Sequence, residues 1–313
     1  MKKVLRRLLA GELTEDQAVA ELRSLQLDEL GGRAKLDLGR FLRRGVPEVI
    51  LASGKAPIDA ARLAVAMAER QGQGLISRMT PAHQAALQEA AAVSKLQVIP
   101  YAASARVLRG EFTAESVEGK VGILTAGTSD LAAAEEAQMV IEACGLEARL
   151  DSDLGVAGLH RFLGPLAATL EWGADVIIVA AGMDGVLPGL VAGLIDLPVI
   201  GLPVSTGYGR GGAGEAALTT MLQSCSTGLV VVNIDNGVGA GAAAVLIAQR
   251  RLRGRNEAAT AASRAPTSSA PSKKGAIVRH TSPTPGMANV RPRTSSVKST
   301  PANSQGKPRR RRP

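Results

Sequence analysis

The sequence predicts an α/β protein with a doubly wound parallel sheet. From Gly119 to about Arg251, short apolar strands alternate with helix-forming segments, which is typical of parallel sheets covered by helices. Ala174–Ala180 is apolar throughout, as expected of a strand buried on both faces. Aromatic residues make up only 2% of the chain, so the core must consist of small and aliphatic side chains.

The first 117 residues are expected to form two smaller parts. Residues 1–30 form a helical segment, because leucines recur at helical spacing and Thr14 precedes Gln17 by three residues, as in a capping box. Residues 31–117 form a small α/β region. Its strands are expected at 46–53, 74–79 and 96–103, and its helices at 57–70 and 80–94.

Residues 118–255 are expected to form the larger α/β domain, whose elements are mostly separated by glycine or proline. We predict strands at 120–124, 146–151, 174–180, 198–203 and 229–234. We predict helices at 131–144, from the 153–162 loop to about 172, within 181–194, at 215–223 and at 239–251.

Residues 256–313 differ from the rest, with eight of the 16 prolines and few apolar side chains. Such a segment cannot bury enough surface to offset its ordering entropy, so we expect it to be disordered. It holds 12 Lys and Arg against one Glu, a balance of +11, so the other 255 residues carry −2 of the total charge of +9. This basic tail could bind acidic partners such as nucleic acid or anionic lipid, but its composition favours a solvated tail without a specific partner.

The two cysteines, Cys144 and Cys225, have no CxxC spacing and are too few for a disulfide framework or a zinc site. The basic N-terminus lacks the apolar region of a signal peptide, and no apolar run reaches membrane-spanning length. We therefore expect a cytoplasmic protein without membrane contact.

The unusual residues of the larger domain follow the predicted strands, where parallel sheets bind their ligands. The first loop holds Gly127, Thr128, Ser129 and Asp130 directly before a helix. Its amides and hydroxyls suit an anion, and Asp130 could accept hydrogen bonds from a sugar. An ordinary helix cap explains the same residues.

The next loop, 153–162, places His160 beside Arg161 among glycines. An imidazole here could move protons, and a guanidinium could bind phosphate or carboxylate, although a lone histidine is more often structural. Asp184 follows the most apolar strand, at a position where it would also cap the next helix.

A second glycine-rich loop contains Ser205, Thr206, Gly207 and Tyr208, whose ring could stack on a ligand. Each loop is a weak signal alone, but four of them on one sheet indicate a nucleotide-like pocket.

Cys225 lies between two serines, ahead of Gly228 and the last strand. It should therefore lie near the end of the sheet opposite to the strand-end loops, which favours a small buried residue over a nucleophile. It can reach the pocket only if the helix 215–223 runs along the pocket wall or another subunit meets it there.

The larger domain resembles the LarB family of nickel-pincer cofactor biosynthesis proteins in four motifs, in this order and spacing: AGTSD, DLGVAGLHR, AGMDGVLPGLVAGLIDLPVIGLPVSTGYG and MLQSCSTGLVVVNIDNGVGA. The upstream segments RRGVPEVILASGK and ISR resemble the same family, so the resemblance covers about 35–252. The larger domain is more distantly similar to the PurE class of aminoimidazole ribonucleotide carboxylases and mutases, which implies a PurE-like three-layer sandwich.

The resemblance implies carboxylation of nicotinic acid adenine dinucleotide at C5 of its pyridinium ring, with CO2 or bicarbonate as co-substrate. Hydrolysis of the phosphoanhydride then releases AMP. A cationic pyridinium cannot attack CO2, whereas addition of a thiolate turns the ring into an enamine that can. The cysteine of the family falls on Cys225, and its catalytic glutamate falls on Asp184, which is one methylene shorter. His160 is expected to join them as a catalytic residue.

The same resemblance implies that Thr128, Ser129 and Asp130 hold the phosphate or ribose. Arg161 and the loop from Ser205 line the pocket. Arg78 joins them from the ISR motif, where the family usually has threonine in place of serine. The family uses Mg2+, whose protein ligands the motifs do not identify, and no organic cofactor. Its members form octamers in which neighbouring subunits complete each site.

Two other functions stay open. A purine-pathway carboxylase or mutase would act on an aminoimidazole ribonucleotide, which is already an enamine and needs no thiol. A non-catalytic regulatory protein, like the circadian phase modifier group of the same family, would keep the fold and bind a partner or nucleic acid through its basic tail.

Overall fold

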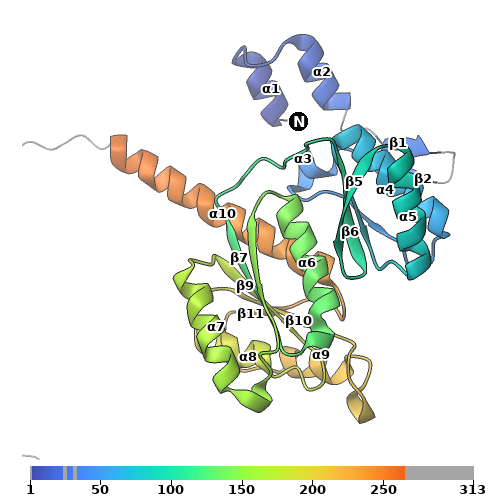
Figure 1. Cartoon of the computed structure of the whole chain (residues 1–313). Helices are drawn as coiled ribbons and strands as arrows, with labels where there is room; N and C mark the ends of the chain where they lie inside the picture. The colour runs from blue at the N-terminus through green and yellow to red at the C-terminus, as the bar shows by residue number, and fades with distance from the viewer. Residues whose placement is uncertain (1, 24–26, 31–33, 265–313) are drawn as a thin grey trace, which may run out of the picture. The chain divides into compact units, whose positions relative to one another are not determined.

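The computed structural model describes residues 2–23, 27–30 and 34–264 (Figure 1). Within these ranges the chain forms a five-stranded sheet, a four-stranded sheet and a two-stranded ribbon. The five-stranded sheet is parallel throughout and carries helices on both faces, so the predicted α/β fold is confirmed.

The strand order of the larger domain is β11-β10-β9-β7-β8. The bounds are β7 (Lys120–Thr125), β8 (Glu147–Asp151), β9 (Val176–Ala181), β10 (Val199–Pro203) and β11 (Leu229–Val231). The chain places β8 on one side of β7 and the three later strands on the other, so the order reverses between β7 and β9. In open α/β sheets this reversal creates a crevice at the carboxyl ends of the strands, where ligands bind.

Helices α6 (Leu131–Ala143) and α10 (Gly237–Arg264) pack on one face of this sheet. Helices α7 (His160–Glu171), α8 (Leu187–Ala192) and α9 (Glu215–Leu222) pack on the other (Figure 1). Strand β9 serves both cores: Val176 and Ile178 face the first, and Ile177 and Val179 the second. This double burial explains why the strand is apolar at every position.

The small domain has a mixed sheet in the order β3-β4-β6-β5. Its elements are α3 (Arg40–Arg44), β3 (Val49–Leu51), α4 (Pro57–Gln71), β4 (Gln73–Ser77), α5 (Pro81–Val93), β5 (Leu96–Tyr101) and β6 (Ser104–Arg109). The sequence did not predict β6. It pairs with β5 across Ala102 and Ala103, and Ala102 adopts a positive φ of 43° without the glycine or asparagine that usually marks such a turn.

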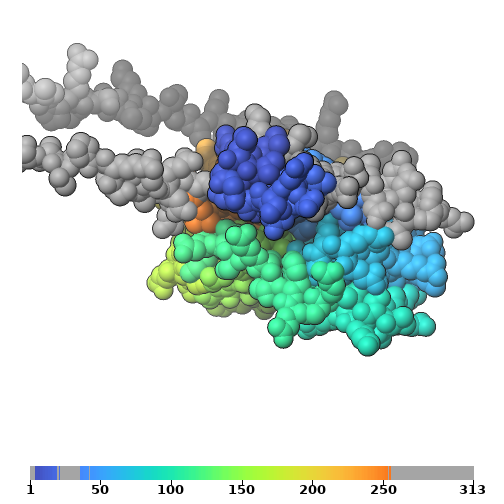
Figure 2. Space-filling view, turned by 90° about the horizontal axis from the view of Figure 1, so that it is seen from above, coloured from blue at the N-terminus to red at the C-terminus, as the bar shows by residue number. Residues whose placement is uncertain are grey.

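Helix α6 joins the two domains. One side of the small sheet is covered by α4 and α5, and strands β4, β5 and β6 also contact α6. In the space-filling view the teal surface of the small domain meets the green surface of the larger domain (Figure 2). The carbonyl of Ala143 on α6 accepts a hydrogen bond from Gln73 at 2.9 Å, so polar as well as apolar contacts connect the domains.

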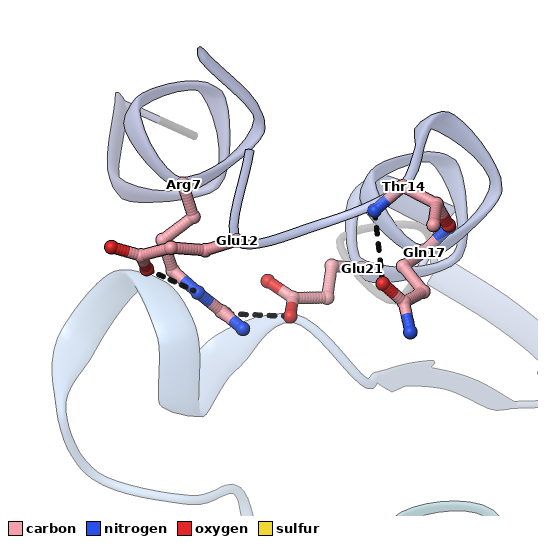
Figure 3. A network of polar contacts seen from close by, with 5 residues as sticks. All are labelled: Arg7, Glu12, Thr14, Gln17 and Glu21. Atoms are coloured by element: carbon pink, nitrogen blue, oxygen red, sulfur yellow. Dashed lines mark hydrogen bonds and ion pairs between the residues drawn. The ribbon is translucent and has the colours of Figure 1, made fainter. Parts of the chain in front are cut away.

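The N-terminal residues form two helices, α1 (Lys2–Leu9) and α2 (Glu15–Arg23). Arg7 forms ion pairs with Glu21 and Glu12 (Figure 3), at 2.7 Å and 3.7 Å respectively. The predicted capping box is confirmed: the Thr14 amide donates to the Gln17 side chain at 2.9 Å, and the Gln17 amide donates to the Thr14 hydroxyl at 3.2 Å.

The helical prediction is wrong at the end of this segment. Residues Leu27–Leu30 form β1, which pairs antiparallel with β2 (Ala34–Asp37). Leucine spacing alone could not reveal this pairing, because tertiary contacts override helix propensity.

Helix α10 continues to Arg264, past its predicted end at Arg251 and into the segment expected to be disordered. The alanine-rich sequence from 257 to 263 favours helix, which accounts for the extension. The rest of that segment, 265–313, lies outside the described residues. Across the described ranges, no helix has both the length and the apolar character needed to cross a bilayer.

Close packing of α10 on α6 requires glycine at 241. A Cβ there would lie 2.6 Å from the Ala137 carbonyl oxygen and 3.0 Å from Val140 Cβ. Gly241→Ala should therefore lower the free energy of unfolding by about 1–3 kcal/mol, measured by urea denaturation. Gly254→Ala on the same helix is the control, because a Cβ there meets nothing within 4 Å and should stabilise the helix by about 0.5–1 kcal/mol. Equal effects of the two substitutions would contradict this packing argument.

Candidate active site

The loops after β7, β9 and β10 meet at Thr206. Its hydroxyl donates to Asp130 Oδ1 at 2.7 Å, and its carbonyl accepts the amide of Met183 at 2.9 Å. A side chain at Gly182 would collide with Thr206, because its Cβ would lie 2.2 Å from the hydroxyl oxygen. Three of the predicted loops therefore lie together at the crevice where the strand order reverses.

Asp130 connects two of these loops. It is 3% exposed, and its Oδ2 accepts the amide of Gly127 at 2.9 Å while its Oδ1 accepts Thr206. Asp130 is the N-cap residue of α6 but makes no side-chain capping hydrogen bond to that helix, so the interpretation as an ordinary helix cap is wrong. Its carboxylate connects Gly127 with Thr206 instead. Thr128 and Ser129 are exposed beside it, with hydroxyls available to a ligand.

The loop with His160 and Arg161 lies next to the first loop. The amide of Leu154 donates to the Thr125 carbonyl at 3.0 Å. Arg161 Nη1 lies 2.8 Å from Asp153 Oδ2, and both residues are exposed. His160 is exposed at the start of α7.

Asp184 is presented at the surface by a sharp backbone turn. Met183 and Gly185, on either side of it, have positive φ angles of 49° and 63°. The amide of Val186 donates to Asp184 Oδ1 at 3.4 Å, which is a long capping contact at the start of α8. Tyr208 is 83% exposed, so its ring is open to stacking with a ligand.

Arg78 reaches the larger domain from the end of β4. It adopts a φ of 55° and donates from Nη2 to the Asp235 carbonyl at 2.6 Å. Asp235 in turn accepts the amide of Ser205 at 2.8 Å through Oδ1. Our sequence reasoning missed Asp235, although it follows the last strand and the same strand-end rule would have selected it.

Cys225 is exposed, so the expectation of a buried residue is wrong. It lies at the amino end of β11 and lines an open groove of about 700 Å³ between α8 and α9. Small residues on α8 make room for this groove. The lining residues are Gly185, Val186, Gly189, Leu190, Gly193, Leu194, Thr219, Thr220, Gln223, Ser224, Cys225 and Ser226.

The groove runs from the Asp184 loop to the turn with Cys225 without bringing these two residues together. The hydroxyl of Ser226 donates to the Gly189 carbonyl at 2.6 Å, so the cysteine turn packs against the middle of α8. Asp184 precedes the start of that helix. The two side chains are therefore separated by more than one helical turn, on the order of 5 Å or more.

The described residues offer no group of three or more His, Cys, Asp and Glu side chains that could hold a metal ion. The residues present do not fit a magnesium site built from protein ligands alone, and the expected Mg2+ stays a prediction. Mg2+ in enzymes is commonly held by substrate phosphates and waters with one or two carboxylates.

Comparison with known proteins gives two family matches that together span most of the described chain. Residues 27–111 match the LarB/PurE-like N-terminal domain, and residues 120–265 match AIR carboxylase. An uncharacterized protein of Methanocaldococcus jannaschii is 39% identical over 259 residues, which cover 80% of this chain and 98% of that protein. The chain belongs to the LarB/PurE-like family.

Other relatives match shorter stretches of this LarB/PurE-like protein. The N5-carboxyaminoimidazole ribonucleotide mutase of Thermotoga maritima is 30% identical over 131 residues, which cover 41% of this chain and 74% of the mutase. The corresponding mutase of Pyrococcus abyssi is 38% identical over 91 residues, 28% of this chain and 50% of that protein. A crystal structure of a Treponema denticola PurE2 variant aligns with 48% of this chain and 99% of its own, at 18% identity and a TM-score of 0.33.

The two cysteines of the LarB/PurE-like chain should differ in reactivity. Burial raises the pKa of Cys144 to about 12, so at pH 8 only about 1 in 10,000 of its thiols is ionised. Cys225 is exposed. Native protein treated with iodoacetamide at pH 8 should therefore gain one carbamidomethyl group, located at Cys225 by peptide mass spectrometry. Native Cys225→Ala should gain none and unfolded Cys225→Ala one, whereas rapid labelling of native Cys144 would contradict this assignment.

Proposed function

We propose that this protein carboxylates the pyridinium ring of nicotinic acid adenine dinucleotide at C5 and hydrolyses its phosphoanhydride. The products are AMP and the pyridinium-3,5-biscarboxylate mononucleotide. The general reaction class, that of a PurE-like carboxylase or mutase, rests on the family matches. The proposed pyridinium substrate and thiolate mechanism are supported chiefly by one observation, the exposed Cys225 in the groove between α8 and α9.

A thiol is needed because of the electronic character of the substrate. The pyridinium ring is electron-poor, so its carbon atoms cannot attack CO2. The Cys225 thiolate adds to the ring, which neutralises the positive charge and forms an enamine whose C5 attacks CO2. Asp184 then takes the proton from C5, and the electron pair of that C–H bond expels the thiolate and restores the aromatic ring.

Water cleaves the phosphoanhydride in a separate step. The loops that meet at Thr206 suit the recognition of this dinucleotide, because Thr128 and Ser129 present hydroxyls and Arg161 presents a guanidinium. In this proposal the exposed ring of Tyr208 stacks on a ring of the substrate, and His160 exchanges protons near the same loops. Mg2+ held by the phosphates would supply charge stabilisation when present.

Loss of the nucleophile should abolish turnover. Wild-type protein incubated with the dinucleotide, bicarbonate and Mg2+ should release AMP and a mononucleotide that is about 44 Da heavier than nicotinic acid mononucleotide, because a carboxyl group replaces a ring hydrogen atom. Cys225→Ala should lower formation of the heavier product by at least about a thousandfold, followed by chromatography and mass spectrometry. Cys144→Ala is the matched control. An active Cys225→Ala enzyme would rule out the thiolate mechanism.

The second candidate is an N5-carboxyaminoimidazole ribonucleotide mutase, which the Thermotoga maritima and Pyrococcus abyssi relatives favour. Its substrate already carries an electron-rich enamine carbon and needs no covalent adduct. Turnover of that ribonucleotide, unaffected by Cys225→Ala, would support this alternative over the pyridinium carboxylase.

We also propose that neighbouring subunits of an octamer complete each site. Within one subunit Cys225 lines the groove beside the middle of α8, whereas Asp184 precedes that helix and is not among the lining residues. A site that uses both is most simply formed where two copies meet.

A shared site predicts complementation between two inactive variants. Cys225→Ala and Asp184→Asn, co-expressed with different tags and purified through both, should form mixed oligomers with about one quarter of wild-type activity, because half of the sites hold each intact residue. Each variant alone should be inactive. If one subunit supplied both residues, the mixed oligomers would be inactive as well, and the proposal of a shared site would fail.

A further inference from the structure

Glu136 is a buried carboxylate that the proposed chemistry does not use. It lies on α6 and is 4% exposed. Its Oε2 accepts the amide of Val238, in the first turn of α10, at 3.1 Å. Its Oε1 lies 3.9 Å from Nε of Arg78, and the hydroxyl of Ser77 is a further hydrogen-bond partner. One carboxylate therefore contacts both the start of α10 and the end of β4.

Arg78 extends this contact to the candidate active site. While Nε faces Glu136, Nη2 donates to the Asp235 carbonyl at 2.6 Å. The amide of Asp235 donates to the Pro203 carbonyl at 2.9 Å, and its Oδ1 accepts the amide of Ser205 at 2.8 Å. A continuous series of contacts thus leads from α6 through the small domain to the loop 204–209.

The same loop is held from α6 at a second point. Asp130, which precedes α6, accepts the hydroxyl of Thr206 at 2.7 Å. Ser205 and Thr206 are adjacent, so two consecutive residues are fixed from one helix, one directly and one through Arg78 and Asp235. Both the Arg78 and Asp235 backbones adopt positive φ, 55° and 56°, which is costly for residues other than glycine and requires support from the surrounding contacts.

We propose that Glu136 is a positioning residue that orients Arg78 and Asp235 and thereby sets the conformation of the loop 204–209. This inference rests on the proposed function in one respect, namely that the loop binds the dinucleotide. The conformational effect on the loop is independent of the substrate and can be measured without it.

Stabilisation of the fold alone does not explain a carboxylate at this buried position. Burial raises the pKa of its carboxyl group, so the ionised form is less favourable in the folded than in the unfolded chain. Its contribution to stability is therefore largest below the ordinary value of 4.5 and falls as the pH rises through the raised pKa. Glutamine at this position would keep an oxygen acceptor for the Val238 amide but lose the charge that faces Arg78.

Glu136→Gln therefore keeps the hydrogen bond to the start of α10 and removes only the charge that would position Arg78. Amide hydrogen exchange of peptides covering 203–212, measured without ligand, should become at least about fivefold faster, while the melting temperature stays within the range of the control. The Michaelis constant for the dinucleotide should rise by a similar factor with little change in kcat, because Glu136 touches no reacting atom.

Glu142→Gln is the matched control. Glu142 lies on the same helix and accepts the hydroxyl of Tyr101 from the small domain at 2.5 Å, but it has no contact with Arg78 or the 235 turn among the described interactions. Exchange at 203–212 should be unchanged in this variant. Equal acceleration in both variants would indicate general loosening between the domains and would overturn the proposal, as would unchanged exchange in Glu136→Gln.

A second variant tests the same contacts from the other side. Arg78→Gln should accelerate exchange at 203–212 at least as much as Glu136→Gln does, because it also removes the direct contact with Asp235. The double variant should add little to Arg78→Gln alone, because Glu136 acts on the loop through Arg78. Additive effects would contradict the proposal, and this variant decides the question if Glu136→Gln does not fold. If wild-type protein fails to turn over the dinucleotide, the proposed function fails while the exchange experiments still test Glu136.

Discussion

The burial of helix α6 between two sheets is the constraint on which the rest of the structure depends. Four of its alanines (133, 134, 137 and 143) and its residues Met139, Val140 and Ile141 are buried against the five-stranded sheet, the small domain and α10. A helix that is apolar on most of its surface is stable only when other elements cover it. Because Asp130 directly precedes α6 and Glu136 lies on it, the element that organises the core is also connected to the strand-end loops.

The sequence predicted well what local chemistry determines. Ala174–Ala180 could be identified as a central strand because burial on both faces demands an apolar residue at every position. The strand-end rule likewise located the loops with Asp130, Asp184 and Thr206, since it depends only on the alternation of strands and helices. Strands β1 and β6 escaped prediction because each is defined by its partner rather than by its own residues.

Prediction of the candidate site was less complete where it depended on packing. The position of Cys225 ahead of β11 followed from chain order, but its exposure depends on the space that Gly189 and Gly193 leave beside α8. Asp235 belongs to the site through contacts with Ser205 and with Arg78, which is 157 residues away in the chain. No local pattern encodes a contact across that separation, whereas the family motifs did mark Arg78 as a binding residue.

The two outer strands of the five-stranded sheet restrict how copies of this chain can associate. Strand β8 carries Glu147, Arg149 and Asp151 at alternate positions, and β11 has only three residues. Charged or very short edges resist pairing with a strand of another molecule. Sheet extension is therefore disfavoured on both sides, and association is left to helices and loops. Association through helices and loops adds no strand to either edge of the sheet. The carboxyl ends of the strands therefore stay accessible to a small molecule.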